Sequence, residues 1–190
     1  GGVSNPNSID FIQVGNHTNV KKYSIGSNHL LYILQNGELF GRGDNNYGQL
    51  GDSTTTYSTT VIRIGNENSW KEISTSNIHS AAIKSDGTLW IWGRGENGEL
   101  GNGLSKDFYI MKNPLNMKNV AQVSAGNYHT LAIKSDGTLW AWGYNGMAEC
   151  GLPQTVNSAR APTQIGAGSY WVCCSAGYAH SAAIKSDGSI

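Results

Sequence analysis

The chain has 190 residues, 13 basic and 13 acidic side chains, and a formal net charge of zero. It contains no basic run or stripe, which argues against nucleic-acid binding, and no run of about 18 apolar residues that predicts a membrane-spanning segment. Only 14 % of the residues are charged, against about 25 % in an average soluble domain, a composition more typical of an extracellular, cell-surface or virion protein.

A segment of 50 residues recurs along the chain. Residues 82–90 (AIKSDGTLW) return unchanged at 132–140, residues 183–188 repeat the first six of them one position late, and residues 32–40 (YILQNGELF) are a weaker copy. A period of this length predicts an array of similar supersecondary units. We expect the tail of one repeat followed by three full repeats and an incomplete one, over residues 1–19, 20–69, 70–119, 120–170 and 171–190.

Each repeat contains the pattern of four short strands. In the second repeat, residues 70–75 alternate in polarity, residues 80–84 carry small interior side chains, and residues 88–93 are rich in β-branched and aromatic residues. A fourth extended segment is expected near Pro114 and Leu115. The pair Asp86-Gly87 predicts a two-residue type I′ hairpin, in which both residues have positive φ.

Four short strands per repeat, without helical periodicity, predict an all-β propeller built of four-stranded antiparallel blades. A single blade cannot bury both faces of its sheet, so neighbouring blades must stack. The recurring tryptophans Trp90, Trp92, Trp140 and Trp142 are therefore expected to pack between blades.

The two ends of the chain do not coincide with repeat ends. Residues 1–4 (GGVS) have neither Met nor the features of a signal peptide, and the chain stops just after the Asp187-Gly188 turn. Neither end carries the polar cap expected of a terminal repeat. We expect an internal piece of a longer propeller, completed by further repeats of the same chain or of another chain.

Four histidines, His29, His79, His129 and His180, recur at the repeat spacing. They could suggest a metal site, but each occupies the same place in its own blade, so the array distributes them around a ring. We expect a structural role, with each ring bonded to the backbone near a tight turn. His17 lies outside the repeat register and is expected at the surface.

The remaining reactive side chains give no catalytic pattern. Cys150, Cys173 and Cys174 match neither a metal-ligand nor a disulfide framework. In register Cys174 should point inward and Cys173 outward, which favours free thiols over a vicinal disulfide. Asp86, with its two repeat copies, is expected in a turn with left-handed φ. The glycine-rich residues 93–98 lack the following helix that a phosphate-binding loop requires.

These motifs resemble the RCC1 (regulator of chromosome condensation) repeat family. Residues 124–133 (SAGNYHTLAI) fit its Gly-x-x-His-[ST]-x-Ala-[IL] segment, and residues 43–51 (GDNNYGQLG) fit its Gly-x-Asn-x-x-Gly-Gln-Leu-Gly segment. The resemblance implies a seven-bladed β-propeller of which about half is present. The first repeat departs from the pattern at Arg42, which replaces the tryptophan of later repeats, so we expect Arg42 at a partly open position.

Residues that break the repeat are better candidates for function than those that recur. They concentrate in residues 52–60, 102–113 and 152–162 and at the loop tips. Tyrosine, arginine, phenylalanine and methionine at such places are typical of protein interfaces. The candidate partner-binding residues are Tyr47, Arg94, Glu96, Phe108, Tyr109, Tyr144 and Met147. For Phe108 and Met111 the alternative is that they cover the blade edge.

The resemblance implies a non-enzymatic scaffold that binds a protein partner or self-assembles, without cofactor or metal. Members of the family include guanine-nucleotide exchange factors, protein inhibitors of enzymes and recognition domains. Two alternatives stay open: a structural repeat domain of a cell-surface or viral assembly, and a guanine-nucleotide exchange factor for a small GTPase.

Overall fold

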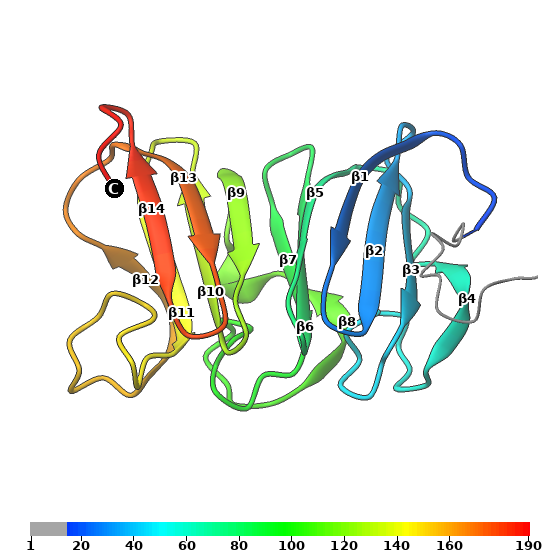
Figure 1. Cartoon of the computed structure of the whole chain (residues 1–190), viewed down its shortest axis with the longest axis horizontal. Helices are drawn as coiled ribbons and strands as arrows, with labels where there is room; N and C mark the ends of the chain where they lie inside the picture. Colours follow the sequence, from blue (N-terminus) through cyan, green and yellow to red (C-terminus); the bar gives the residue numbers. More distant parts are fainter. Residues whose placement is uncertain (1–14) are drawn as a thin grey trace, which may run out of the picture.

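The computed structural model describes residues 15–190, which form fourteen β-strands and one short 3-10 helix (Figure 1). Most of the tail predicted for residues 1–19 lies outside this range. Within it there is no α-helix, and no helix that could span a membrane. The all-β prediction is confirmed.

The strands form three four-stranded antiparallel sheets and one two-stranded sheet, each in sequence order. The first blade contains β1 (Val20–Ile25), β2 (His29–Leu34), β3 (Leu39–Gly43) and β4 (Ser58–Arg63). The second contains β5 (Trp70–Thr75), β6 (His79–Lys84), β7 (Leu89–Gly93) and β8 (Phe108–Lys112). The third contains β9 (Val120–Ala125), β10 (His129–Lys134), β11 (Leu139–Tyr144) and β12 (Ser158–Ile165). The fourth contains β13 (Trp171–Ala176) and β14 (Ser181–Lys185).

The blades follow one another in a row, and the first strands of successive blades, β1, β5, β9 and β13, contact one another along it (Figure 1). Since neighbouring strands are antiparallel, all the first and third connections of the blades leave at one end. This end, at the lower edge of Figure 1, is called the loop face here. The second connections, at the opposite end, form the turn face.

The hairpin between β6 and β7 differs from the prediction. Gly87 has a φ of +78°, but Asp86 is not among the non-glycine residues with positive φ. The Gly87 N–H donates to the Lys84 carbonyl at 2.9 Å. Residues 85–87 therefore form a three-residue hairpin loop, in which a type I turn is followed by a glycine in the left-handed region. Asp86 is suited to this turn because its carboxylate accepts the Thr88 N–H at 2.9 Å. The type I′ prediction was wrong, as was the left-handed φ expected for the aspartates.

The fourth strand of the second blade also lies elsewhere than predicted. It is β8, Phe108–Lys112, whereas Pro114–Asn116 forms the short helix η1. Proline lacks the N–H that a strand ladder needs and has a fixed φ, while aromatic and β-branched residues such as Phe108, Tyr109 and Ile110 suit a strand.

Each blade packs on the next through apolar side chains and a buried indole. Trp92 of β7 is completely buried against Leu31, Ile33 and Leu50 of the first blade. Its indole N–H donates to the Gln49 carbonyl at 2.8 Å. The predicted packing of tryptophans between blades is confirmed at this interface.

The next interface repeats the arrangement. Trp142 of β11 is completely buried with Ile83, Ile91 and Leu100 of the second blade, and its indole N–H donates to the Glu99 carbonyl at 2.7 Å. Arg42, the counterpart of these tryptophans, is half-buried on the opposite, outer side of the first blade. The partly open position predicted for it is confirmed.

The innermost strands are joined by serine side chains. The hydroxyl oxygens of Ser24, Ser74 and Ser124 accept the backbone N–H groups of Thr75, Ala125 and Ala176 in the next blade, at 3.0, 2.9 and 2.9 Å. An unpaired strand edge is otherwise free to pair with other chains. Each of these bonds links the first strands of two neighbouring blades and satisfies one backbone N–H on that edge.

Candidate functional site

A row of tyrosines and one arginine crosses the loop face over successive blades. The guanidinium carbon of Arg94 lies 5.3 Å from the ring centroid of Tyr47 and 5.8 Å from that of Tyr128. Tyr128 makes edge contacts with Tyr144 and Tyr178, with centroids 6.5 and 6.1 Å apart. These five residues, the tyrosine–arginine row, connect all four blades.

The arginine of the row is held in place by an acidic neighbour. Glu96 forms an ion pair with Arg94 and accepts its Nε–H at 3.0 Å. The hydrogen bond to Glu96 is the main reason why the pKa of Arg94 is raised. A guanidinium fixed between two aromatic rings presents a flat, ordered surface and loses little freedom when a partner binds it.

The structure brings together four of the seven candidate residues and separates the rest. Tyr47, Arg94 and Tyr144 belong to the row, and Glu96 supports it. Met147 is 73 % exposed at the tip of the next loop. Its backbone N–H donates to the buried Glu149 carboxylate at 2.8 Å, which holds this tip in place.

The other two candidates lie on the outer strand β8. Phe108 is partly buried against the core between the second and third blades, so the alternative that it covers the blade edge describes it better. Tyr109 is 45 % exposed and packs against Gly48 of the first blade, where an added Cβ would come within 2.6 Å of it. Met111 is also partly buried, against the core between the first and second blades.

Two members of the row, Tyr128 and Tyr178, were missed by sequence reasoning. Both lie in connections between a first and a second strand, outside the segments and loop tips from which the candidates were taken. A signal was nevertheless present. Tyr128 occupies the repeat position of Asn28 and Ile78, so it breaks the repeat as clearly as the loop-tip residues do.

The recurring histidines connect blades, but their partners differ from those predicted. In three of the four, the ring Nε2 bonds a side-chain hydroxyl in the next blade, not the backbone. The pairs are His29 with Ser80 at 2.9 Å, His79 with Thr130 at 2.9 Å, and His129 with Ser181 at 2.8 Å. Each hydroxyl in turn donates to a backbone carbonyl, of Gln49, Glu99 and Glu149 respectively.

Burial keeps these rings neutral. Desolvation lowers the pKa of His29 and of His129 to about 4 and that of His79 to about 3. Within residues 15–190 no group of three His, Cys, Asp or Glu side chains could hold a metal ion. The structural role expected for the recurring histidines is confirmed for His29, His79 and His129, although not with the backbone partners that were expected. His180 is exposed, and His17 is exposed as predicted.

The cysteines are free thiols. Cys150 and Cys174 are buried and Cys173 is half-buried, so the predicted inward and outward orientations of the vicinal pair are confirmed. Desolvation raises the pKa of Cys150 and of Cys174 to about 12. Both thiols are therefore protonated near neutral pH and lack the thiolate that a nucleophile needs.

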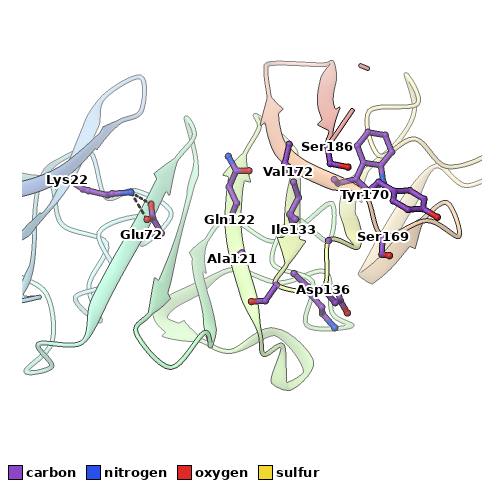
Figure 2. Close-up of a pocket in the computed structure, with 14 residues that line it drawn as sticks. Lys22, Glu72, Ala121, Gln122, Ile133, Asp136, Ser169, Tyr170, Val172 and Ser186 are labelled. Atoms are coloured by element: carbon purple, nitrogen blue, oxygen red, sulfur yellow. Dashed lines mark hydrogen bonds and ion pairs between the residues drawn. The ribbon is translucent and has the colours of Figure 1, made fainter. Parts of the chain in front are cut away.

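A polar hollow of about 660 Å³ lies over the inner strands and the turn face of the third and fourth blades (Figure 2). Its charged side chains already have partners: Lys22 pairs with Glu72, and Lys134 lies 4.2 Å from the centroid of the Trp140 ring. Asp136 accepts the Thr138 hydroxyl at 2.7 Å. The hollow therefore offers no unpaired charge to a ligand.

Comparison with models of protein families shows to which family the chain belongs. Two family models, each described as the regulator of chromosome condensation (RCC1) repeat, match it, one over residues 20–49 and 120–149 and the other over residues 86–133 and 136–184. The chain belongs to the RCC1 repeat family. No curated protein matches it in sequence.

Solved structures show the same RCC1 propeller fold. Prp20p from Saccharomyces cerevisiae, studied for its binding to Gsp1p and histones, has 22 % identity and a TM-score of 0.79, over 87 % of this chain and 43 % of that one. Yeast RCC1 (Prp20) bound to Kap60 has 22 % identity and a TM-score of 0.79 over 92 % and 44 %. Human WBSCR16 has 22 % identity and a TM-score of 0.78 over 88 % and 45 %. The chain thus spans less than half the length of these proteins and forms part of an RCC1-type propeller.

Proposed function

We propose that this part of an RCC1-like propeller is a non-enzymatic scaffold that binds a protein partner through its loop face. The observation that carries the proposal is the continuous tyrosine–arginine row. Its members come from four blades, break the repeat, and are of the residue types that dominate binding energy at interfaces. The likeness to Prp20p and to Kap60-bound Prp20, which bind proteins, supports it.

Photo-crosslinking tests the proposal directly. A photoreactive phenylalanine analogue placed at Tyr128 should crosslink the partner in native extract, whereas the same analogue at the exposed Tyr170, on the turn face, should not. The double variant Tyr47→Ala/Tyr178→Ala should lose the partner, with Tyr170→Ala as the matched control. Equal crosslinking from both faces, or catalytic turnover abolished by a loop substitution, would contradict the scaffold.

Under this proposal the four repeats are part of a ring that further RCC1-like repeats of this chain or another chain complete. The repeats cover residues 20–69, 70–119, 120–170 and 171–190.

A role in a cell-surface or viral assembly predicts contacts among copies of the propeller in native extract. Nucleotide exchange predicts faster nucleotide release from a small GTPase. Neither alternative has a residue-level feature comparable to the row.

A further inference from the structure

A pocket of about 320 Å³ lies between the connection from β8 to β9 and the third blade. Pro114, Leu115 and Lys118 line it from the connection, and Lys134 and Trp140 line it from the third blade. The second and third blades, which form it, each have four strands. The connection from one such blade to the next leaves at the turn face, so the pocket lies at the opposite end of the blades from the tyrosine–arginine row.

The connection holds a leucine where its two counterparts hold glycine. Gly65, between the first and second blades, and Gly166, between the third and fourth, have φ values of +66° and +69°. Leu115 has a φ of +43°, in the left-handed region that is unfavourable for a residue with a Cβ. Its side chain is 61 % exposed, so burial does not offset the strain. Such strain is typical of positions kept for a function.

The other end of the connection is fixed to its surroundings on both sides of Lys118. The Met117 carbonyl accepts the Leu89 N–H at 3.2 Å, and the Asn119 carbonyl accepts the Ser135 N–H at 2.7 Å. The Met117 side chain is buried in the core between the second and third blades. Lys118 itself is exposed. Its backbone is therefore held in place at the pocket while its side chain remains accessible.

The second blade shows how a carboxylate binds at the equivalent place. The Lys84 ammonium group lies 3.8 Å from the centroid of the Trp90 ring, and it also forms an ion pair with Glu67 of the connection before that blade. In the third blade the Lys134 ammonium group lies over the Trp140 ring in the same way, at 4.2 Å. An ammonium group has three N–H donors, so the contact with the ring does not prevent an ion pair.

The third blade has no such carboxylate of its own. Glu67 corresponds in the repeat to Met117. Within residues 15–190, neither Lys118 nor Lys134 forms an ion pair. Asp136 is close to Lys134 in sequence but does not line the pocket, and neither does any other acidic residue of this range. Two lysines therefore line the pocket without an anionic partner.

We propose that this pocket binds an acidic and apolar segment of a protein partner. A glutamate or aspartate carboxylate of the segment pairs with Lys118 and Lys134, as Glu67 pairs in the second blade. A neighbouring apolar side chain of the segment packs against Leu115 and the Trp140 ring. Charge complementarity and the exposed leucine together select this occupant, because a phosphate group alone would pair with the lysines but leave Leu115 without a contact.

Fluorine NMR of the whole 190-residue protein, labelled with 5-fluorotryptophan, tests the site. The probe is the capped peptide GSLEELSG, and the capped peptide GSLQQLSG is its matched control. The acidic probe should shift the Trp140 resonance saturably. The Trp90 resonance should not shift, because the lysine beside it already has Glu67 as its partner. The neutral probe should bind about tenfold more weakly. Spectra of Trp140→Phe and Trp90→Phe assign the two resonances.

Substitutions in the connection separate binding from folding. Lys118→Gln should weaken binding of the acidic probe, whereas Lys112→Gln, at an exposed lysine on β8, should not. Leu115→Gly, which introduces the residue type of Gly65 and Gly166, should also weaken binding. It should not lower the melting temperature, because glycine adopts the left-handed conformation without strain. A leucine with a merely structural role would give the reverse result.

Three results would overturn the proposal: no saturable shift of the Trp140 resonance, equal affinity for the acidic and the neutral probe, or tighter binding of inorganic phosphate than of the acidic probe. The wild-type protein suffices for each of them, so a poorly folded variant does not affect the outcome. The double variant Tyr47→Ala/Tyr178→Ala should bind the acidic probe as the wild type does, which distinguishes failure of this site from failure of the loop-face scaffold.

Discussion

The ring Nε2 of His79 and the hydroxyl of Thr130 in the next blade lie 2.9 Å apart, and the relation fixes the tautomer of the histidine. Thr130 gives its single hydroxyl proton to the Glu99 carbonyl at 2.9 Å. His79 must therefore donate through Nε2–H, which leaves Nδ1 as an acceptor for the Ser76 hydroxyl at 2.9 Å. The Thr130 hydroxyl of the third blade thus bonds both a histidine ring and a loop carbonyl of the second blade.

Thr130→Val should destabilise the protein, because it removes both bonds while keeping the side-chain volume. The Nε2–H of His79 would be left buried without an acceptor, at a cost of about 1–3 kcal/mol. Urea unfolding followed by tryptophan fluorescence measures the change. Thr130→Ser is the matched control, because serine occupies this position as Ser80 and Ser181 in other blades, and it should unfold near wild type. Equal loss in the two variants would show that the hydroxyl is not responsible.

Stability should fall as the pH is lowered from about 6.5 towards 4. His29 and His129 have a folded-state pKa of about 4 and His79 of about 3, whereas histidine in an unfolded chain titrates near 6.5. Between these values the unfolded state binds more protons, so each histidine lowers the free energy of unfolding by about 1.4 kcal/mol per pH unit. Glu99 acts in the opposite direction, because burial raises its pKa.

Urea unfolding at pH 7.5 and at pH 5.5 measures how the free energy of unfolding changes with pH. Both values lie above the range in which ordinary carboxylates titrate. His79→Gln, whose amide nitrogen can donate to the same hydroxyl, should flatten the slope, whereas His17→Gln, at the exposed His17, should not. A slope that is the same in all three proteins would assign the acid sensitivity to other groups.

The sequence predicted the blade because the repeat sets both the strand pattern and the spacing of tryptophans. It also carried a signal for the histidine partners that was not used. A hydroxyl residue follows His79, His129 and His180, but Leu30 follows His29.

The features that were predicted wrongly depend on context that a local pattern does not contain. The dipeptide Asp86-Gly87 suits two kinds of hairpin, and the choice depends on strand register. Likewise, the position of β8 is set by its pairing with β7 and by the contact of Tyr109 with Gly48. The row at the loop face could be predicted only in part, because Tyr128 meets Arg94 of the second blade and Tyr178 of the fourth only when the blades stack.

Arg94→Ala should weaken partner binding and leave the stability of the fold nearly unchanged. The ion pair between Arg94 and Glu96 lies at the surface, and such pairs contribute about 0–1 kcal/mol. We therefore expect a melting temperature close to that of the wild type but partner binding weaker by about tenfold or more, as for an arginine in an interface core. Arg160→Ala, at an exposed site on β12, is the control. A large drop in melting temperature with unchanged partner binding would make Arg94 a structural residue.

Trp142→Ala should cost about 3–5 kcal/mol of unfolding free energy, because it removes a completely buried indole and leaves a cavity between two blades. Trp140→Ala, two residues earlier on the same strand, should cost less, because its ring is half-buried at the surface beside Lys134. Guanidinium unfolding followed by far-UV circular dichroism measures both. If the two variants lost the same stability, the position of Trp142 between the second and third blades would have no special role in holding the blades together.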